Sequence, residues 1–222
     1  MIGFLNNCKS MDSLTHPLEV SLKNTVSLFV ASVVSSLSLS TVSLAQVAKY
    51  TIDASHSKIG FEVSHLVIST VEGRFDKVEG EFSFDPSDFT KTSLMATAET
   101  KSINTADKKR DDHLRADDFF DAKKFPKITF KSKKAEKTGE KTFKLTGDFT
   151  MKDVTKEVVF DVTYKGTVKG FQGPVVAFVG ETTINRQDFN VKFQKAVEAG
   201  PVVGDEVKIK ILAEGMEAKA KK

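Results

Sequence analysis

The chain has 222 residues, with 33 Lys and Arg against 30 Asp and Glu, and its composition is that of an ordinary globular protein. The net charge of +3 comes from basic and acidic residues that alternate along the chain. This pattern argues against the concentrated basic surface that nucleic-acid-binding proteins need. The single cysteine, Cys8, excludes a disulfide framework and a four-thiolate metal site. Eighteen Phe beside two Tyr and no Trp provide an unusual amount of purely apolar aromatic volume.

The N-terminal segment, residues 1–45, is predicted to be a signal peptide rather than part of the fold. Residues 24–48 carry no charge, and the apolar run at 26–34 has the length of a signal-peptide hydrophobic region. A small-x-small sequence predicts cleavage after Ala45, so we expect export to the periplasm. The alternative is an uncleaved membrane anchor, which seven serines within 24–48 disfavour. A lipid anchor is disfavoured because the only cysteine, Cys8, precedes the hydrophobic region.

From residue 46 onward, apolar and polar residues alternate, which is typical of β-strands with one buried face. In chain order, this alternation predicts strands at 59–64, 81–84, 127–131, 142–146, 158–164 and 207–211. Turns that contain Gly or Pro separate many of them, and strands at this spacing favour a sandwich or a barrel. The interior of a closed eight-stranded barrel can be plugged by its own side chains or can hold one small ligand. The 16 Phe of this region are enough for either arrangement.

Two segments break the alternation. The charge-rich stretch 105–120 predicts a helix whose N-cap is Thr105 or Asp107. A second, short helical turn is predicted at 66–72, between two strands. Residues 46–222 contain no internal repeat or low-complexity linker, so we expect them to form a single domain.

The residues that usually perform catalysis form no recognisable arrangement. Of the four histidines, His16 lies in the predicted signal peptide, and the spacing of His56, His65 and His113 matches no usual metal-ligand pattern. The parity of His65 directs it to the inner face of its strand, as a hydrogen-bonded core histidine, whereas His113 is expected on a solvated helix face. The sequence has no nucleophile elbow, phosphate loop or dinucleotide fingerprint. We therefore expect no metal site, and binding rather than catalysis.

Several short motifs follow one another in a specific order along residues 49–214. They are Tyr50-Thr51-Ile52-Asp53, His56-Ser57, Phe61-Glu62-Val63-Ser64-His65, Gly73-Arg74-Phe75, Arg110-Asp111-Asp112-His113-Leu114, Asp118-Phe119-Phe120-Asp121-Ala122, Phe125-Pro126, Gly147-Asp148-Phe149-Thr150 and Ile184-Asn185-Arg186-Gln187-Asp188-Phe189. Together they resemble the YceI-like family of exported, lipocalin-like β-barrels that bind polyisoprenoids. This family tends to have Gly in the turn occupied here by Lys152 and Asp153, and also at Asn190. Asn and Asp tolerate left-handed backbone better than other non-Gly residues, so we expect the fold to be kept.

The resemblance implies an all-β fold, namely a closed antiparallel lipocalin-like barrel of about eight strands with one or two short helices. It implies a lumen that holds an amphiphile with an isoprenoid tail, such as a polyprenyl phosphate or a quinone. It implies no established enzymatic activity and no other cofactor. A prenyl tail offers no hydrogen bonds, so its site needs apolar side chains, which the alternating strands can supply. The candidates for this apolar lumen are Phe61, Val63, Phe75, Phe82, Phe84, Phe130, Leu145, Phe160, Val162 and Phe178.

Selectivity would then come from polar side chains at the mouth of the barrel. The candidates are His65, Arg74 and Arg186, since a guanidinium can bind a phosphate or a quinone carbonyl. Each arginine could instead form a surface ion pair. Two further functions are left open: an enzyme acting on an isoprenoid lipid, with His65 or His113 as base, and a filled barrel that serves as an interaction module. The expected partner is an isoprenoid lipid, without nucleic acid or a stable membrane anchor, and a homodimer is left open.

Overall fold

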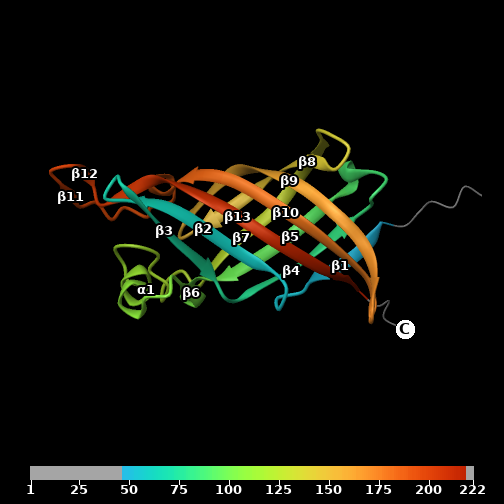
Figure 1. Cartoon of the computed structure of the whole chain (residues 1–222), viewed down its shortest axis with the longest axis horizontal. Coiled ribbons are helices and arrows are strands. Elements are labelled where there is room, and N and C mark those ends of the chain that lie inside the picture. The colour runs from blue at the N-terminus through green and yellow to red at the C-terminus, as the bar shows by residue number, and fades with distance from the viewer. Residues whose placement is uncertain (1–46, 219–222) are drawn as a thin grey trace, which may run out of the picture. The chain divides into compact units, whose positions relative to one another are not determined.

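The structure, a computed structural model, describes residues 47–218, and most of them lie in strands (Figure 1). The strands are β1 (Ala48–Ile52), β2 (Lys58–His65), β3 (Ser69–Phe75), β4 (Val78–Phe84), β5 (Ser93–Glu99), β6 (Ile103–Asn104), β7 (Lys127–Lys137), β8 (Thr142–Met151), β9 (Val154–Gly170), β10 (Gly173–Asn185), β11 (Ala196–Val197), β12 (Gly200–Pro201) and β13 (Val203–Glu217). The helical elements are α1 (Lys108–Leu114) and the short 3-10 segments η1 (Phe89–Lys91), η2 (Thr100–Ser102) and η3 (Arg186–Phe189). The predicted signal peptide at 1–45 lies outside the described residues. Within 47–218, no helix has the length and apolar character needed to span a membrane.

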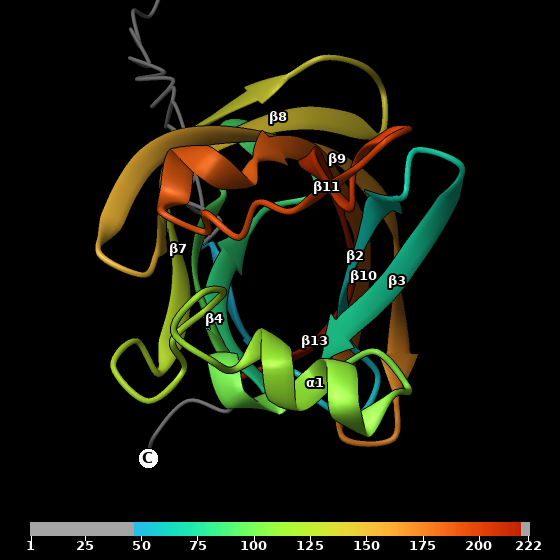
Figure 2. The ribbon, with the colours of Figure 1, turned by 90° about the vertical axis from the view of Figure 1, so that its left-hand side faces the viewer.

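The predicted closed antiparallel barrel is confirmed. Eight strands follow one another in the hydrogen-bonded order β1-β4-β5-β7-β8-β9-β10-β13, and β13 pairs in turn with β1. The pairing of Tyr50 with Glu217 joins the first strand to the last. Figure 2, which looks at the barrel from the side of α1, shows these strands as a ring.

The two ends of the barrel are built differently, because β13 pairs with two different strands along one side. Its C-terminal residues pair with β1, whereas its earlier residues pair with β2, which pairs in turn with β3. β1 and β2 thus share one position in the ring, and a turn at 53–57 separates them. The segment that contains α1 lies beside β6 at the end where β2 and β3 complete the ring (Figures 1 and 2). We call this end the α1 end and the opposite one the distal end.

The alternation of the strands places aromatic side chains inside the barrel and charged side chains outside it. Phe84 and Phe143 are almost completely buried, and their ring centroids lie 4.8 and 6.4 Å from that of Phe178. Both ring pairs meet edge to face, a geometry that adds stability beyond the burial of apolar area. On the outer face, Lys144 forms an ion pair of 2.8 Å with Asp161 on the neighbouring strand. The barrel interior is therefore the hydrophobic core of the domain.

The helical turn predicted at 66–72 is wrong. Residues 66–68 form a tight turn, and β3 begins at Ser69. Leu66 and Val67 have left-handed backbone, with φ of 52° and 69°, which reverses the chain so that β3 pairs with β2. The β-branched residues Thr70 and Val71 suit an extended conformation better than a helical one.

The helix predicted at 105–120 is shorter than expected. It begins after Asp107, whose carboxylate accepts a hydrogen bond from the backbone N–H of Arg110. Thr105 is not the cap, because its hydroxyl instead donates to the buried carboxylate of Asp111 over 2.6 Å. After Leu114 the chain folds back on itself through turns, and this brings the residues that follow α1 against the barrel interior.

The two positions that depart from the glycine pattern both have left-handed backbone. Lys152, rather than Asp153, takes this conformation in the β8–β9 turn, with φ of 55°, and Asn190 takes it after η3, with φ of 59°. The two positions are tied together. The ammonium of Lys152 donates to the carbonyl of Asn190 over 2.9 Å, and the amide of Asn190 donates to the carboxylate of Asp153 over 3.0 Å. These hydrogen bonds offset the backbone cost of lacking glycine.

Candidate ligand-binding cavity

Two apolar cavities occupy the barrel interior. One of about 130 Å³, the α1 chamber, lies at the α1 end, and the other of about 100 Å³, the distal chamber, lies toward the distal end. The large side chains around the α1 chamber are Ile59, Phe61, Val63, Phe75, Leu114, Phe119, Phe120, Ile128, Phe130, Phe149, Met151, Ile184, Arg186, Val191, Val203, Val207 and Ile209. Those around the distal chamber are Ile52, Ile59, Val78, Phe82, Leu94, Phe130, Phe143, Leu145, Phe160, Val162, Phe178, Ile211 and Leu212.

The two chambers share part of their walls. Ile59, Ala96 and Phe130 contribute to both of them. The ring of Phe130 meets the ring of Phe160 edge to face, with 5.1 Å between the centroids. A chain-like molecule that fills both chambers must therefore pass beside Phe130.

Nine of the ten predicted lumen residues line a chamber. Those in the α1 chamber are Phe61, Val63, Phe75 and Phe130, and those in the distal chamber are Phe82, Phe130, Leu145, Phe160, Val162 and Phe178. Phe84 lines neither chamber. Its ring packs against those of Phe89, Tyr164 and Phe178, with centroids 5.6, 5.0 and 4.8 Å away, so Phe84 plugs the barrel.

Sequence reasoning missed the contribution of the segment around α1. Leu114, Phe119 and Phe120 line the α1 chamber, and the ring of Phe120 meets that of Phe75 on β3 edge to face at 5.9 Å. The two adjacent Phe within a charge-rich stretch were the available signal. The α1 chamber is thus bounded by strands on its sides and by this segment at its end.

Arg186 is buried in the wall of the α1 chamber, and its donors are bound to the protein itself. Its Nε donates to the carbonyl of Gly204 over 2.8 Å, and Nη1 donates to that of Val191 over 2.7 Å. Nη2 donates to the carbonyl of Val203 and to the carboxylate of Asp205, over 3.2 and 2.9 Å. Burial lowers the pKa of the guanidinium from its ordinary value, and Asp205 opposes this shift. Arg186 therefore ties η3 and the chain after it to the start of β13.

We expect an Arg186→Met variant to lose about 2 to 4 kcal/mol of unfolding free energy, because it leaves buried carbonyl groups without donors. Urea unfolding followed by circular dichroism measures this loss. The control is Arg74→Met, which removes a half-exposed ion pair worth at most about 1 kcal/mol. Equal losses in the two variants would contradict the assigned role of Arg186.

The structure places the other polar candidates away from both chambers. Arg74 points outward and forms an ion pair of 2.6 Å with Asp76, as in the alternative that the sequence left open. His65 is half-buried at the last position of β2 and lines neither chamber, so the core position expected for it is not found. His113 is half-exposed on α1, and its Nε2 lies 2.8 Å from the carboxylate of Asp118. None of these three residues lines either chamber.

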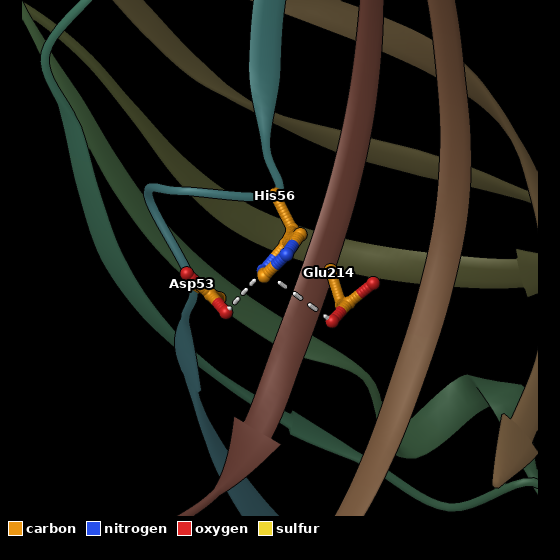
Figure 3. A group of neighbouring side chains, drawn as sticks. All are labelled: Asp53, His56 and Glu214. Carbon is orange, nitrogen blue, oxygen red and sulfur yellow. Dashed lines mark hydrogen bonds and ion pairs between the residues drawn. The ribbon is translucent and has the colours of Figure 1, made fainter. Parts of the chain in front are cut away.

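A cluster of three titratable side chains spans the break between β1 and β2 (Figure 3). The Nδ1 atom of His56 lies 2.8 Å from the carboxylate of Asp53 and 3.9 Å from that of Glu214 on β13. Hydrogen bonds from Ser55 and His56 lower the pKa of Asp53 to about 2, and the hydrogen bond to Asp53 raises the pKa of His56 above its usual value. The backbone N–H of Asp53 also donates to the carbonyl of Glu214. This cluster therefore fastens the interrupted strand to β13.

The contribution of this cluster to stability is expected to depend on pH. The raised pKa of His56 stabilises the fold below the unfolded value of about 6.5, and this contribution is lost as the pH rises through the folded value. The lowered pKa of Asp53 stabilises the fold above about pH 4, and this contribution is lost as the pH falls toward 2. The difference in melting temperature between the wild type and His56→Ala should therefore be largest between about pH 4 and pH 6.5 and shrink as the pH rises through the folded pKa of His56. A difference that does not change with pH would refute this account.

The strands form a closed antiparallel barrel, and apolar side chains line its two chambers. Arg186 is the one charged residue among those lining them. These features define a protein of the lipocalin-like barrel class. A family model described as the YceI-like domain matches residues 50–215. The chain therefore belongs to the YceI-like family, as its motifs suggested.

Individual relatives match over different lengths. A UPF0312 protein of Staphylococcus aureus strain N315 is 37% identical over 166 residues, which are 74% of this chain and 95% of that protein. A UPF0312 protein of Vibrio cholerae strain O395 is 42% identical over 90 residues, 40% of this chain, and the match spans about half (48%) of that protein.

Solved structures show the same barrel. BcnA of Burkholderia cenocepacia superposes with a TM-score of 0.67 and 28% identity, covering 74% of this chain and 99% of that one. A polyisoprenoid binding domain from Saccharophagus degradans superposes with a TM-score of 0.58 and 15% identity, covering 78% of this chain and all of that one. At that low identity, the second likeness concerns the fold alone.

Proposed function

We propose that this protein is an exported carrier that holds an isoprenoid amphiphile, a polyprenyl phosphate or a quinone, with its tail in the two chambers. The observation that carries the proposal is the lining of both chambers, which consists almost entirely of aliphatic and aromatic side chains. A prenyl tail offers no hydrogen bonds, so such a lining suits it without any polar contact. The Saccharophagus degradans domain, which has the same fold, is described as polyisoprenoid binding, and this supports the choice of ligand.

The affinity in this proposal comes from the tail rather than from the headgroup. Burial of apolar tail surface contributes about 25 cal/mol per Å², which for a long tail is ample. The donors of Arg186 are bound to backbone carbonyls and to Asp205, so this residue shapes the chamber wall and does not bind the headgroup. The headgroup then lies at the α1 end, in contact with solvent, and the carrier accepts more than one headgroup on a similar tail.

The test is to purify the protein from its host, extract it with organic solvent and analyse the extract by mass spectrometry. The expected result is an isoprenoid lipid in stoichiometric amount. The matched control is the Asp161→Ala variant, in which the substituted side chain lies on the outer face of the barrel. This variant should carry the same lipid as the wild type. An extract without lipid from a folded protein would instead favour the ligand-free interaction module.

Export is the second part of the proposal, and it rests on the predicted signal peptide at 1–45. The expected native N-terminus is Gln46, on protein recovered from the periplasm. Mass analysis of the intact native protein measures this terminus directly. Recovery of membrane-bound protein that still begins at Met1 or Met11 would refute cleavage and with it the proposed compartment.

A further inference from the structure

Two loops at the α1 end expose apolar side chains to solvent. In the turn between β2 and β3, Ile68 is 86% exposed and Val67 is 56% exposed. In the hairpin formed by β11 and β12, Val197 is 47% exposed. We call these three residues the apolar tip. Branched aliphatic side chains gathered at a solvent-facing end indicate an interaction surface rather than part of the core.

The two loops of the apolar tip support each other, although they are far apart in the sequence. The backbone N–H of Leu66 donates to the carbonyl of Val202 over 3.0 Å, and Val203 pairs with His65. Val67 packs so closely on Gly200 that a Cβ atom there would lie 3.0 Å from its Cγ2. Val67 is also held in left-handed backbone, a costly conformation for a β-branched residue. The loops therefore form one continuous surface.

This surface adjoins the end of the α1 chamber. Val63 precedes the β2–β3 turn, and Val191 and Val203 flank the segment that contains the β11–β12 hairpin. All three side chains line the α1 chamber. Figure 2 shows the β2–β3 turn and β11 at the same end of the barrel as α1. A partner that covers the apolar tip thus lies next to the chamber.

The segment that contains the β11–β12 hairpin carries two lysines and one glutamate, so its charge is slightly basic. Lys192 and Lys195 are exposed beside the β11–β12 hairpin, and neither forms an ion pair with another residue of the described part of the chain. The ammonium of Lys195 lies 5.7 Å from the ring centroid of Phe193. Glu198 is the one acidic residue in segments 65–71 and 192–202. Exposed aliphatic side chains flanked by lysines match the interface of a bilayer that carries anionic headgroups.

We propose that the apolar tip inserts into the headgroup region of an anionic membrane and so presents the α1 chamber to the lipid. Val67, Ile68 and Val197 enter the boundary between headgroups and acyl chains, and Lys192 and Lys195 bind the anionic headgroups. This inference extends the proposed function, because it identifies the surface from which the carrier collects its ligand. The docking itself needs no isoprenoid.

The test is co-sedimentation of the purified protein with vesicles of phosphatidylethanolamine and phosphatidylglycerol that contain no isoprenoid. An Ile68→Asp variant is expected to bind them about tenfold more weakly than the wild type, since it puts a charge in place of an inserted apolar side chain. The matched control is Phe171→Asp in the β9–β10 turn, where a fully exposed Phe occupies the distal end. This control should bind as the wild type does. Both sites are exposed, so neither substitution threatens the fold.

The lysines give a second, independent measurement. A Lys192→Gln, Lys195→Gln double variant should lose most of the salt dependence of vesicle binding, and vesicles of phosphatidylcholine alone should bind every variant weakly. Wild-type binding by Ile68→Asp, or an equal loss in Phe171→Asp, would overturn the proposal. The lipid content, measured by mass spectrometry, tests the carrier hypothesis separately from the docking hypothesis. Tip-dependent docking by a protein that never carries lipid would refute the carrier alone, and a lipid-loaded protein indifferent to Ile68→Asp would refute the docking alone.

Discussion

A Phe84→Ala variant is expected to lose about 3 to 5 kcal/mol of unfolding free energy, because it leaves a cavity that the surrounding side chains cannot fill. Phe84 is completely buried and packs against the rings of Phe89, Tyr164 and Phe178. Guanidinium unfolding of lipid-free protein, followed by circular dichroism, measures the loss.

The matched variant is Phe130→Ala, which truncates a Phe that borders both chambers. One side of this ring already faces empty space in the lipid-free protein, so fewer contacts are lost and the expected cost is smaller than for Phe84→Ala. The two variants should rank the other way round in ligand binding: Phe130→Ala should weaken it, and Phe84→Ala should leave it unchanged. A larger destabilisation for Phe130→Ala would show that the chambers are in fact collapsed.

A Phe160→Arg variant is expected to lose its co-purified lipid almost entirely, because an unpaired charge in an apolar chamber is strongly disfavoured. Phe160 lines the distal chamber, and Phe82→Arg on another wall of that chamber should act in the same way. The lipid carried per protein molecule, measured by mass spectrometry, is the readout. Circular dichroism first establishes that the variant is folded.

Two further variants keep this prediction testable if the arginine prevents folding. Val162→Thr retains the shape of the side chain in the distal chamber and adds one hydroxyl, so it should fold and carry less lipid. Asp161→Ala alters the outer face of the same strand, where Asp161 pairs with Lys144, and should leave the lipid load unchanged. Full lipid in folded Phe160→Arg together with its loss in Asp161→Ala would mean that inside and outside are assigned the wrong way round.

The barrel could be predicted because side chains in a strand alternate between its two faces, so the apolar residues at every second position identify the buried face. Arg74 was predicted at the mouth of the barrel, but it points outward and pairs with Asp76, as the same rule requires for a residue next to the inward-facing Phe75. This alternation does not predict which inward-facing side chains leave a cavity between them. Phe84 and Phe82 have the same parity on β4, yet only Phe82 borders a chamber. That difference depends on packing between strands that are distant in sequence.

The α1 end of the barrel was less predictable than the walls, because its β2–β3 turn does not carry the usual turn signals. The turn at 66–68 contains no Gly, Pro, Asn or Asp, and its left-handed backbone is supported by hydrogen bonding to the segment before β13. Arg186 was predicted as a polar mouth residue and lines the α1 chamber, but its burial and its four acceptors depend in large part on the distant start of β13. Contacts of this kind become visible only once the chain is folded.

The pairing of β1 with β13 also determines when during folding an interior can exist. Tyr50 and Glu217 lie near opposite ends of the domain in sequence, so this ladder has the highest loop-closure entropy of any in the barrel. The hairpins from β7 to β10 join neighbouring strands and can form early, whereas the ring closes only after the C-terminal strand has been synthesised. Until then the aromatic inner faces are open to water and to other chains, and an apolar ligand or a chaperone can reach them. The kinetic consequences of a barrel fastened by its first and last strands are slow folding and a long exposure of the apolar inner faces.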